Sequence, residues 1–203
     1  IELAKLQDRV PPFDNATARA IIEKSLGRPV TESFATFKTQ PLAAASIAQV
    51  HAATLKDGTD VVVKVLRPGM KEIISRDLEV MHELARLAKT HSTEARRLRV
   101  DEIVDEYEKT ILDELDLMRE AANAAQLRRN FAGSYLLYVP DVYWDYCRPE
   151  VMVMERIHGV LVSNMDELLL RGTNIQALAE NGVEIFFTQV FRHNFFHADM
   201  HPG

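Results

Sequence analysis

The sequence predicts an α+β protein, with one lobe that mixes strands and helices and a second lobe that is helical. Strand-forming segments are concentrated in the first two thirds of the 203 residues, and helical periodicity dominates the last third. Hydrophobic residues make up 47% of the chain and charged residues 27%, which is an ordinary globular balance and allows a sizeable core. The net charge of −6 disfavours a nucleic-acid-binding protein.

The N-terminal segment is expected to be helical. Residues 1–9 have the character of a helix end that Pro11 stops. Asp14 or Asn15 can cap a second helix, which Gly27 ends. No signal peptide is expected, and no apolar run approaches the ~20 residues that span a bilayer.

A strand-rich region follows. Residues 33–37 and 47–55 contain β-branched and aromatic residues, and the Asp-Gly pair at 57–58 is a tight-turn signal. After this turn comes an apolar run over 61–66 that contains a single lysine. Such a run is typical of a buried strand, and Pro68 ends it.

The remaining elements are mostly helical. Apolar residues at helical spacing predict helices over four ranges: 70–90, 101–131 with Asp101 as its cap, 164–170 and 174–192. Residues 139–157 return to strand character and are expected to form a hairpin around a turn at 148–150. The chain from 194 onwards is expected to be a loop.

Lys64 is the first residue that points to chemistry. A lysine inside a buried strand is unfavourable unless its ammonium group is paired or faces a ligand. An edge-strand lysine whose amine reaches solvent is the alternative. The segment of small residues over 41–50, just upstream, can bring backbone N–H groups close to phosphates, which favours a nucleotide-binding role for Lys64.

The segment over 195–203 is the second candidate. Three interpretations stay open for its polar residues: a metal site made by His197, Asp199 and His201, a structural role, or a general base at Asp199 in phosphoryl transfer. Only the last of these connects the segment with Lys64.

The acidic residues near 113–120 are the third candidate. On a continuous helix Asp116 and Glu120 would share a face, and two like charges there are unfavourable unless a cation lies nearby. They are either a solvated acidic face or the partners of a cation. Lys64 is the natural counter-charge for Glu120.

These motifs together resemble the UbiB family of atypical kinases, also called the ADCK family, across essentially the whole chain. Five segments carry the resemblance: PLAAASIAQVH at 41–51 is similar to its alanine-rich loop, VVVKVLRP at 61–68 to its nucleotide-lysine strand, ELD at 114–116 to its E-x-D motif, REAAN at 119–123 to its R-E-A-x-N motif, and FHADMHPG at 196–203 to its catalytic loop.

The resemblance implies a protein-kinase-like two-lobed fold with extra N-terminal and inserted helices, truncated in the C-terminal lobe. Residues 1–157 would hold the N-terminal helices and the N-lobe, with the inserted helices at about 70–131. Residues 158–203 would begin the helical C-lobe and end in the catalytic loop of the same single kinase-like domain. The inserted helices would lie as a lid over the groove that binds protein substrates in ordinary kinases.

The resemblance also implies site residues. Lys64 would pair with Glu120 and hold the α- and β-phosphates, Asp199 would be the proton acceptor, and Glu114 with Asp116 would form a regulatory motif. Nucleotide contacts are expected from Pro41, Leu42, Ala43, Ala44, Ala45, Ser46, Ile47, Ala48, Gln49, Lys64 and Glu155. Glu155 could equally be a solvated charge at a strand end. Alanine in place of glycine is expected to stiffen the loop, because alanine is strained at positive φ.

The leading functional expectation is an ATP-dependent kinase or ATPase that uses ATP and Mg²⁺ in ubiquinone (coenzyme Q) biosynthesis. The resemblance implies partners among quinone precursors, biosynthetic enzymes or anionic lipid, and a place at the cytoplasmic face of the bacterial inner membrane. Membrane helices are expected outside this chain, and metal ligands after Gly203, so no metal ligand is assigned within it.

Two other functions stay open. A small-molecule phosphotransferase of the aminoglycoside or choline kinase type has a very similar catalytic loop. A non-catalytic, nucleotide-gated scaffold that binds quinone precursors is the third possibility. The alanine-rich loop and the Glu114 and Asp116 pair favour the first function over the second.

Overall fold

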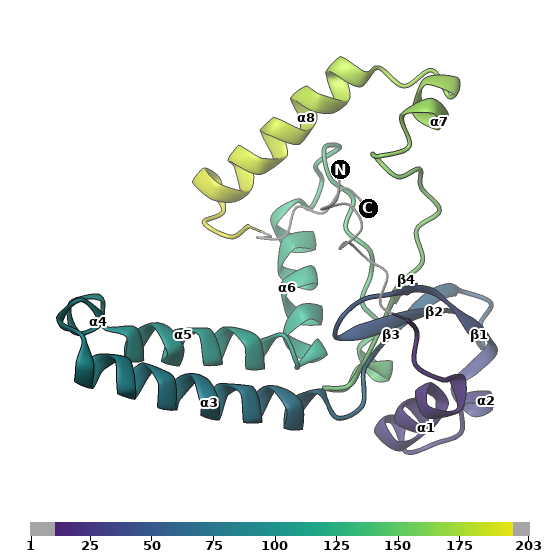
Figure 1. The fold of residues 1–203 in the computed structure, drawn as a ribbon. Helices are drawn as coiled ribbons and strands as arrows, with labels where there is room; N and C mark the ends of the chain where they lie inside the picture. The colour runs from purple at the N-terminus through teal and green to yellow at the C-terminus, as the bar shows by residue number, and fades with distance from the viewer. Residues whose placement is uncertain (1–10, 197–203) are drawn as a thin grey trace. The chain divides into compact units, whose positions relative to one another are not determined.

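The computed structural model describes residues 11–196, which form two compact units (Figure 1). The first unit runs up to Ala121 and includes Val142–Glu155, and the second comprises Ala122–Asp141 and the chain from Arg156 onwards. The second unit thus includes residues 122–141, which the sequence assigns to the N-lobe. The division into lobes at 157 and 158 stays a prediction.

A four-stranded antiparallel sheet with the order β1-β2-β3-β4 is the centre of the first unit. Its strands are β1 (Phe34–Ala44), β2 (Ala48–Leu55), β3 (Asp60–Leu66) and β4 (Val151–Glu155). β3 is paired on both sides, and Lys64 lies opposite Val50 of β2 and Met152 of β4. The alternative of an edge-strand lysine is therefore wrong.

One face of this sheet forms the hydrophobic core. Side chains alternate along a strand, so every second residue of β3 points to the same face. The core on that face includes Val61, Val63, Val65, Val151, Val153 and, from α1 (Asn15–Leu26), Ile22, all fully buried. Each buried side chain of this size contributes roughly 1.5–3 kcal/mol. Lys64 alternates with these valines and so belongs to the opposite face.

Local signals place the boundaries of α1. The Thr17 N–H donates to Asp14 Oδ1 at 2.9 Å, and Gly27 ends the helix with a φ of 69°. These contacts confirm the helix predicted between Asp14 and Gly27. A short helix that the sequence did not signal, α2 (Val30–Ser33), leads into β1.

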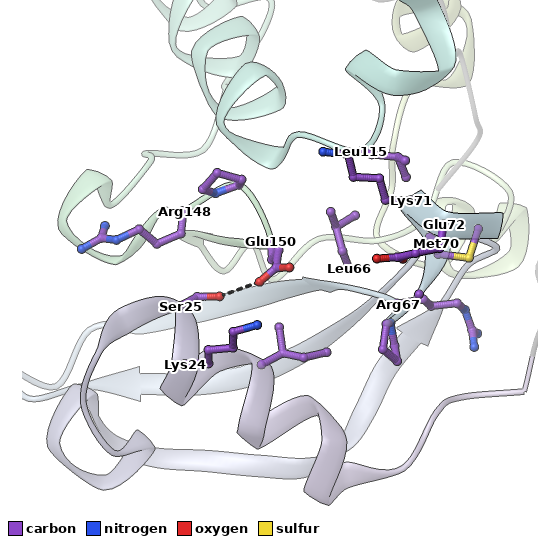
Figure 2. A pocket seen from close by; sticks show the side chains of 14 residues that line it. Lys24, Ser25, Leu66, Arg67, Met70, Lys71, Glu72, Leu115, Arg148 and Glu150 are labelled. Carbon is purple, nitrogen blue, oxygen red and sulfur yellow. Dashed lines mark hydrogen bonds between the residues drawn. The ribbon is translucent and has the colours of Figure 1, made fainter. Parts of the chain in front are cut away.

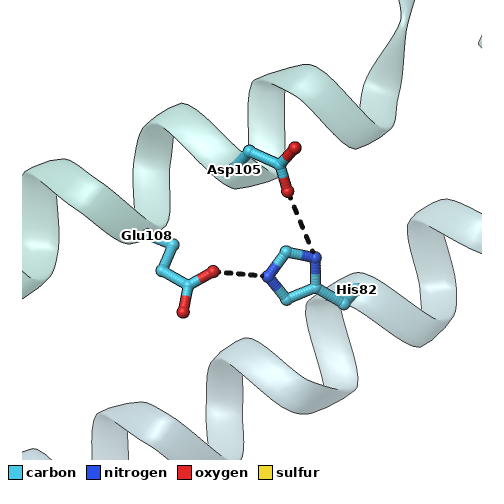
Figure 3. A group of neighbouring side chains, drawn as sticks. All are labelled: His82, Asp105 and Glu108. Atoms are coloured by element: carbon cyan, nitrogen blue, oxygen red, sulfur yellow. Dashed lines mark hydrogen bonds and ion pairs between the residues drawn. The ribbon is translucent and has the colours of Figure 1, made fainter.

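The inserted region contains α3 (Met70–His91), α4 (Thr93–Leu98) and α5 (Val100–Asp113), followed by α6 (Leu117–Asn130). α3 confirms the helix predicted over 70–90, and it runs antiparallel to α5 (Figure 1). His82 of α3 lies between two carboxylates of α5, with Nε2 2.8 Å from Glu108 Oε2 and Nδ1 3.7 Å from Asp105 Oδ1 (Figure 3). These contacts link the two helices.

The prediction of one helix over 101–131 is wrong, because the chain breaks between α5 and α6. The Met118 N–H donates to Asp116 Oδ1 at 2.9 Å, and the Leu117 N–H donates to the Pro149 carbonyl at 2.9 Å. Asp116 therefore precedes α6 and does not share a helical face with Glu120. Asp101 is not a cap either: it lies in the first turn of α5 and is ion-paired with Lys89.

The prediction of a hairpin over 139–157 is half right. β4 is present, but Trp144–Tyr146 is a 3₁₀ turn rather than a strand. The Val153 N–H donates to the sulfur of buried Cys147 at 3.4 Å instead of to a carbonyl of a partner strand. Isolated bridges, such as Val142 with Met154, hold this segment against β4.

Helices make up the regular structure described in the second unit. α7 (Met165–Leu170) and α8 (Ile175–Phe187), with the π-helical turn Thr188–Arg192 that follows it, agree with the ranges 164–170 and 174–192. In the same unit Arg128 donates to the Val139 carbonyl at 2.6 Å and to Asp141 at 2.8 Å. Within residues 11–196, no helix combines the length and the apolar character needed to cross a membrane.

Candidate nucleotide-binding site

Lys64 and Glu120 form a close ion pair in the first unit. Lys64 Nζ lies 2.7 Å from both carboxylate oxygens of Glu120. β3 positions the lysine, and the first turn of α6 positions the glutamate, 56 residues further along the chain. The contact expected between the two side chains is present, and its role in nucleotide binding stays a prediction.

The surroundings of Lys64 combine this charge with an apolar surface. Its cross-strand neighbours Val50 and Met152 share its face of the sheet, as does Val62 two residues earlier on β3. Val50 and Val62 are half-buried, and the Lys64 side chain is 26% exposed. An amine beside aliphatic side chains suits a ligand with a charged part and a flat apolar part.

The alanine-rich segment is a β-hairpin rather than a long loop. β1 continues through Ala44 and β2 begins at Ala48, so the turn is confined to residues 45–47. The Ala45 N–H donates to the Ala48 carbonyl at 2.8 Å and closes the turn. The alanines have no positive φ, since Arg99 and Asn194 are the non-glycine residues of the described chain with positive φ, and the expected stiffness of the segment stays a prediction.

Two backbone donors in this turn are available to a ligand. The N–H groups of Ser46 and Ile47 have no hydrogen-bond partner among residues 11–196. The carbonyls of the turn are engaged by Arg67, whose Nε donates to Ala45 at 3.0 Å and whose backbone N–H donates to Ile47 at 2.8 Å. A short turn held in this way and carrying unpaired N–H groups is suited to binding an anion.

The side chain of Gln49 does not belong to the Lys64 face, and its predicted contact with a nucleotide stays a prediction. It lies opposite Val65, a core residue, and is fully buried. Its Nε2 lies 2.9 Å from Nε2 of His51, also fully buried. The Gln49 side chain therefore points into the core, and its backbone alone can contact a ligand on the Lys64 face.

His51 is a residue of this region to which the sequence assigned no role. Its Nδ1 lies 2.9 Å from the Lys38 carbonyl of β1, and its ring stacks on Phe37 with centroids 4.9 Å apart. Burial lowers the pKa of His51, so the neutral ring is favoured. The carbonyl requires an N–H at Nδ1, which leaves Nε2 as the acceptor for Gln49.

The remaining predicted site residues lie on other parts of the chain. Glu114 and Asp116 lie at the break between α5 and α6, where Asp116 caps α6. Glu155 is the last residue of β4 and pairs with Val61. Asp199, together with His197 and His201, lies outside the described residues.

A cavity of about 650 Å³ lies elsewhere in the first unit (Figure 2). α1, the connection from β3 to α3, the turn before β4 and Leu115 line it. Ser25 Oγ donates to Glu150 Oε2 at 3.2 Å on its wall. Neither Lys64 nor Glu120 lines this cavity, so it is distinct from the candidate site.

Among residues 11–196, the side chains grouped closely enough to share a metal ion are His82, Asp105 and Glu108. The contacts of His82 with both carboxylates account for their arrangement without an ion (Figure 3). This group lies on the α3–α5 hairpin and contributes nothing to the Lys64 site.

Comparison with known proteins gives a consistent family match. Residues 5–203 match the model of the ABC1 atypical kinase-like domain. A protein named "Probable protein kinase UbiB" from Azotobacter vinelandii is 63% identical over 202 residues, and its namesake from Pseudomonas aeruginosa strain LESB58 is 61% identical. The chain spans 38% of the length of each of these two relatives.

A solved structure supports the fold. The structure described as the complex of Rv3197 with erythromycin from Mycobacterium tuberculosis matches with a TM-score of 0.81 and 32% sequence identity. The match covers 99% of this chain and 49% of that one. The predicted α+β, kinase-like fold is thereby confirmed.

Proposed function

Because this chain belongs to the ABC1 atypical kinase-like family, the family of the UbiB proteins, we propose that it is an ATP-dependent kinase or ATPase that holds nucleotide phosphates with Lys64. The observation that carries the proposal is the Lys64–Glu120 pair, which fixes an amine on a central strand of the sheet whose β1–β2 turn has unpaired N–H groups. A lysine ammonium has three N–H donors, so two can face the carboxylate and one a phosphate.

The neighbouring residues fit the remainder of ATP. Val50 and Val62, on the same face as Lys64, provide apolar contact for the adenine ring. The N–H groups of Ser46 and Ile47 provide backbone donors for phosphate oxygens. ATP would supply the phosphoryl group, with Mg²⁺ as the counter-ion that the family implies.

Nucleotide binding by the full-length protein tests the role of Lys64. We expect Lys64→Met and Glu120→Gln each to weaken ATP binding, with the lysine variant losing about tenfold or more, since a hydrogen bond to a charged group contributes roughly 1.5–3 kcal/mol. Lys109→Met, at an exposed lysine of α5 that contacts Glu106, is the matched control. Equal affinity of all three variants, measured by titration with a fluorescent ATP analogue, would remove Lys64 from the site.

Asp199 is proposed as the proton acceptor in the same reaction. The Asp199→Asn variant is expected to bind ATP as the parent protein does and to hydrolyse or transfer phosphate about 10²–10⁴-fold more slowly, as for loss of a general base. Single-turnover assays separate the two steps. A hydrolysis rate that is unchanged by this substitution contradicts the assignment.

The proposed biological setting is ubiquinone biosynthesis at the cytoplasmic face of the bacterial inner membrane, with quinone precursors, biosynthetic enzymes or anionic lipid as partners. The resemblance to the UbiB family supports this setting. We expect ATP turnover by the full-length protein to rise with anionic lipid vesicles and a phenolic quinone precursor. Turnover that depends instead on choline or an amino sugar would favour the small-molecule phosphotransferase, and nucleotide binding without any turnover would favour the scaffold.

A further inference from the structure

Two polar side chains of β2, just after the alanine-rich turn, are fully buried. Gln49 and His51 are both 0% exposed, and their side chains are joined by a hydrogen bond of 2.9 Å. A buried polar group is unfavourable unless it is hydrogen-bonded, so a pair of this kind needs a structural reason. Both residues lie on β2 directly after the turn that carries the unpaired N–H groups of Ser46 and Ile47.

The reason lies in an irregularity of the neighbouring strand. Phe37 pairs with Ala53 and Pro41 pairs with His51, so three residues of β1, 38–40, lie opposite Ala52 alone, and a further shift of register follows between Pro41 and Ala43. Such a bulge interrupts the backbone ladder and leaves carbonyls without their usual partners. The Lys38 carbonyl lies in this bulge, and His51 Nδ1 donates to it at 2.9 Å. The histidine side chain thus takes the place of a missing backbone donor.

The Gln49 amide holds the His51 ring in the orientation and tautomer that this bond requires. With its N–H at Nδ1, the neutral His51 ring accepts from the Gln49 amide at Nε2. Gln49 itself pairs with Ala44, the last residue of β1 before the turn. The cross-strand link is therefore the bond from His51 to Lys38, and Gln49 supports it from its own strand, while Oε1 of Gln49 has no hydrogen-bond partner among the described residues.

We propose that His51 and Gln49 are positioning residues that fix where β1 resumes after its bulge, and thereby where the N–H groups of Ser46 and Ile47 lie relative to Lys64. The inference rests on the proposed function, in which this turn contacts the nucleotide phosphates. Neither side chain touches the ligand, because both point to the opposite face of the sheet. Their effect should therefore be confined to the phosphate part of the nucleotide.

The test compares ATP with adenosine, which lacks phosphates, in the full-length protein. His51→Phe keeps an aromatic ring against Phe37 but removes both hydrogen bonds, and we expect it to weaken ATP binding roughly ten- to a hundredfold, as for a small misplacement of a binding group. Adenosine affinity should stay unchanged. His51→Asn, whose amide can still donate near the Nδ1 position, should recover most of the lost ATP affinity.

Gln49→Leu is the second variant, and it keeps the bond from His51 to Lys38. It allows the same test if the His51→Phe variant does not fold. It is expected to weaken ATP binding less than His51→Phe, again without a change for adenosine. Equal losses of ATP and adenosine affinity in the variants, or unchanged ATP affinity, would overturn the inference. Failure of the parent protein to bind ATP at all would instead contradict the proposed function, so the two failures are distinguishable.

Discussion

At the scale of single residues, the Lys64–Glu120 ion pair is open to solvent. The Lys64 amine is shared between both oxygens of Glu120, yet the two side chains are 26% and 43% exposed. Ion pairs this accessible to solvent contribute little to stability, because water and salt screen them. The pair can therefore fix the direction of the amine without being essential to the folded state.

Chemical unfolding tests whether the Lys64–Glu120 pair contributes to the stability of the fold. Lys64→Met is expected to change the free energy of unfolding by less than about 1 kcal/mol, because it breaks a solvent-accessible ion pair on a half-buried stem. Urea titration of the parent and the variant measures the difference. A loss of several kcal/mol would show instead that the lysine is chiefly structural.

The buried histidine predicts a pH dependence of stability. Burial lowers the pKa of His51 from its ordinary value of 6.5, so the unfolded chain binds its proton at a higher pH than the folded chain does. Between the two pKa values the unfolded state carries more protons, and stability therefore falls as the pH falls from about neutrality through the folded-state pKa.

Urea unfolding at several pH values between 7.5 and 5 tests this prediction. The parent protein should lose stability on acidification more steeply than His51→Phe, which has no imidazole to protonate at this position. The phenylalanine variant also reports any contribution from the remaining histidines. Parallel pH profiles for the two proteins would exclude His51 as the source of the acid sensitivity.

At the scale of elements, the break between α5 and α6 depends on a few identifiable contacts. Asp116→Ala removes the acceptor for the Met118 N–H and should destabilise the protein by about 1 kcal/mol, the usual effect of losing an N-terminal cap. Asp116→Asn retains a side-chain oxygen and should lose much less. Thermal unfolding of both variants measures the difference, and equal loss would assign the effect to the charge rather than to the cap.

Two glycines give opposite predictions for the same substitution. Gly27 ends α1 at a φ of +69° with nothing within 4 Å of an added Cβ, so Gly27→Ala is strained by its backbone alone and should cost roughly 1–2 kcal/mol. Gly182 lies inside α8, also in open space, and Gly182→Ala should stabilise by roughly 0.5–1 kcal/mol. Melting temperatures that move in the same direction for both variants would contradict this account.

Elements fixed by local chemistry are the ones that could be predicted from the sequence. α1 and α3 follow from apolar spacing and from nearby residues such as Asp14 and Gly27. The break before α6 depends on the Pro149 carbonyl, and the irregular segment before β4 depends on the sulfur of Cys147. Both depend on tertiary packing, so periodicity along the chain does not reveal them.

The candidate site also has one part that could be predicted from the sequence and another that could not. The Lys64–Glu120 contact was expected from the resemblance of two ordered motifs, although its partners are 56 residues apart. His51 was missed because its bond to the Lys38 carbonyl exists only through a bulge in β1, which the sequence does not signal. The side-chain direction of Gln49 could not be predicted either, because strand residues look alike until the register fixes which face each one occupies.

At the scale of the whole molecule, the connection after β4 is the natural place for cleavage. Residues 156–164 have no helix or strand, and Ile157, Leu161 and Val162 are each at least 50% exposed. Limited proteolysis with thermolysin should therefore cut here first, because exposed irregular segments containing large apolar residues are preferred substrates. Mass spectrometry identifies the products, and an earlier cut within β3 or α8 would contradict the prediction.

The antiparallel course of α3 and α5 has a consequence for how the site assembles during folding. A flexible loop of 56 residues would have to lose considerable chain entropy before Lys64 could meet Glu120. Packing of α3 against α5 shortens that search, because the hairpin returns the chain to the sheet through local contacts. We therefore expect the α3–α5 hairpin to form before the ion pair during folding.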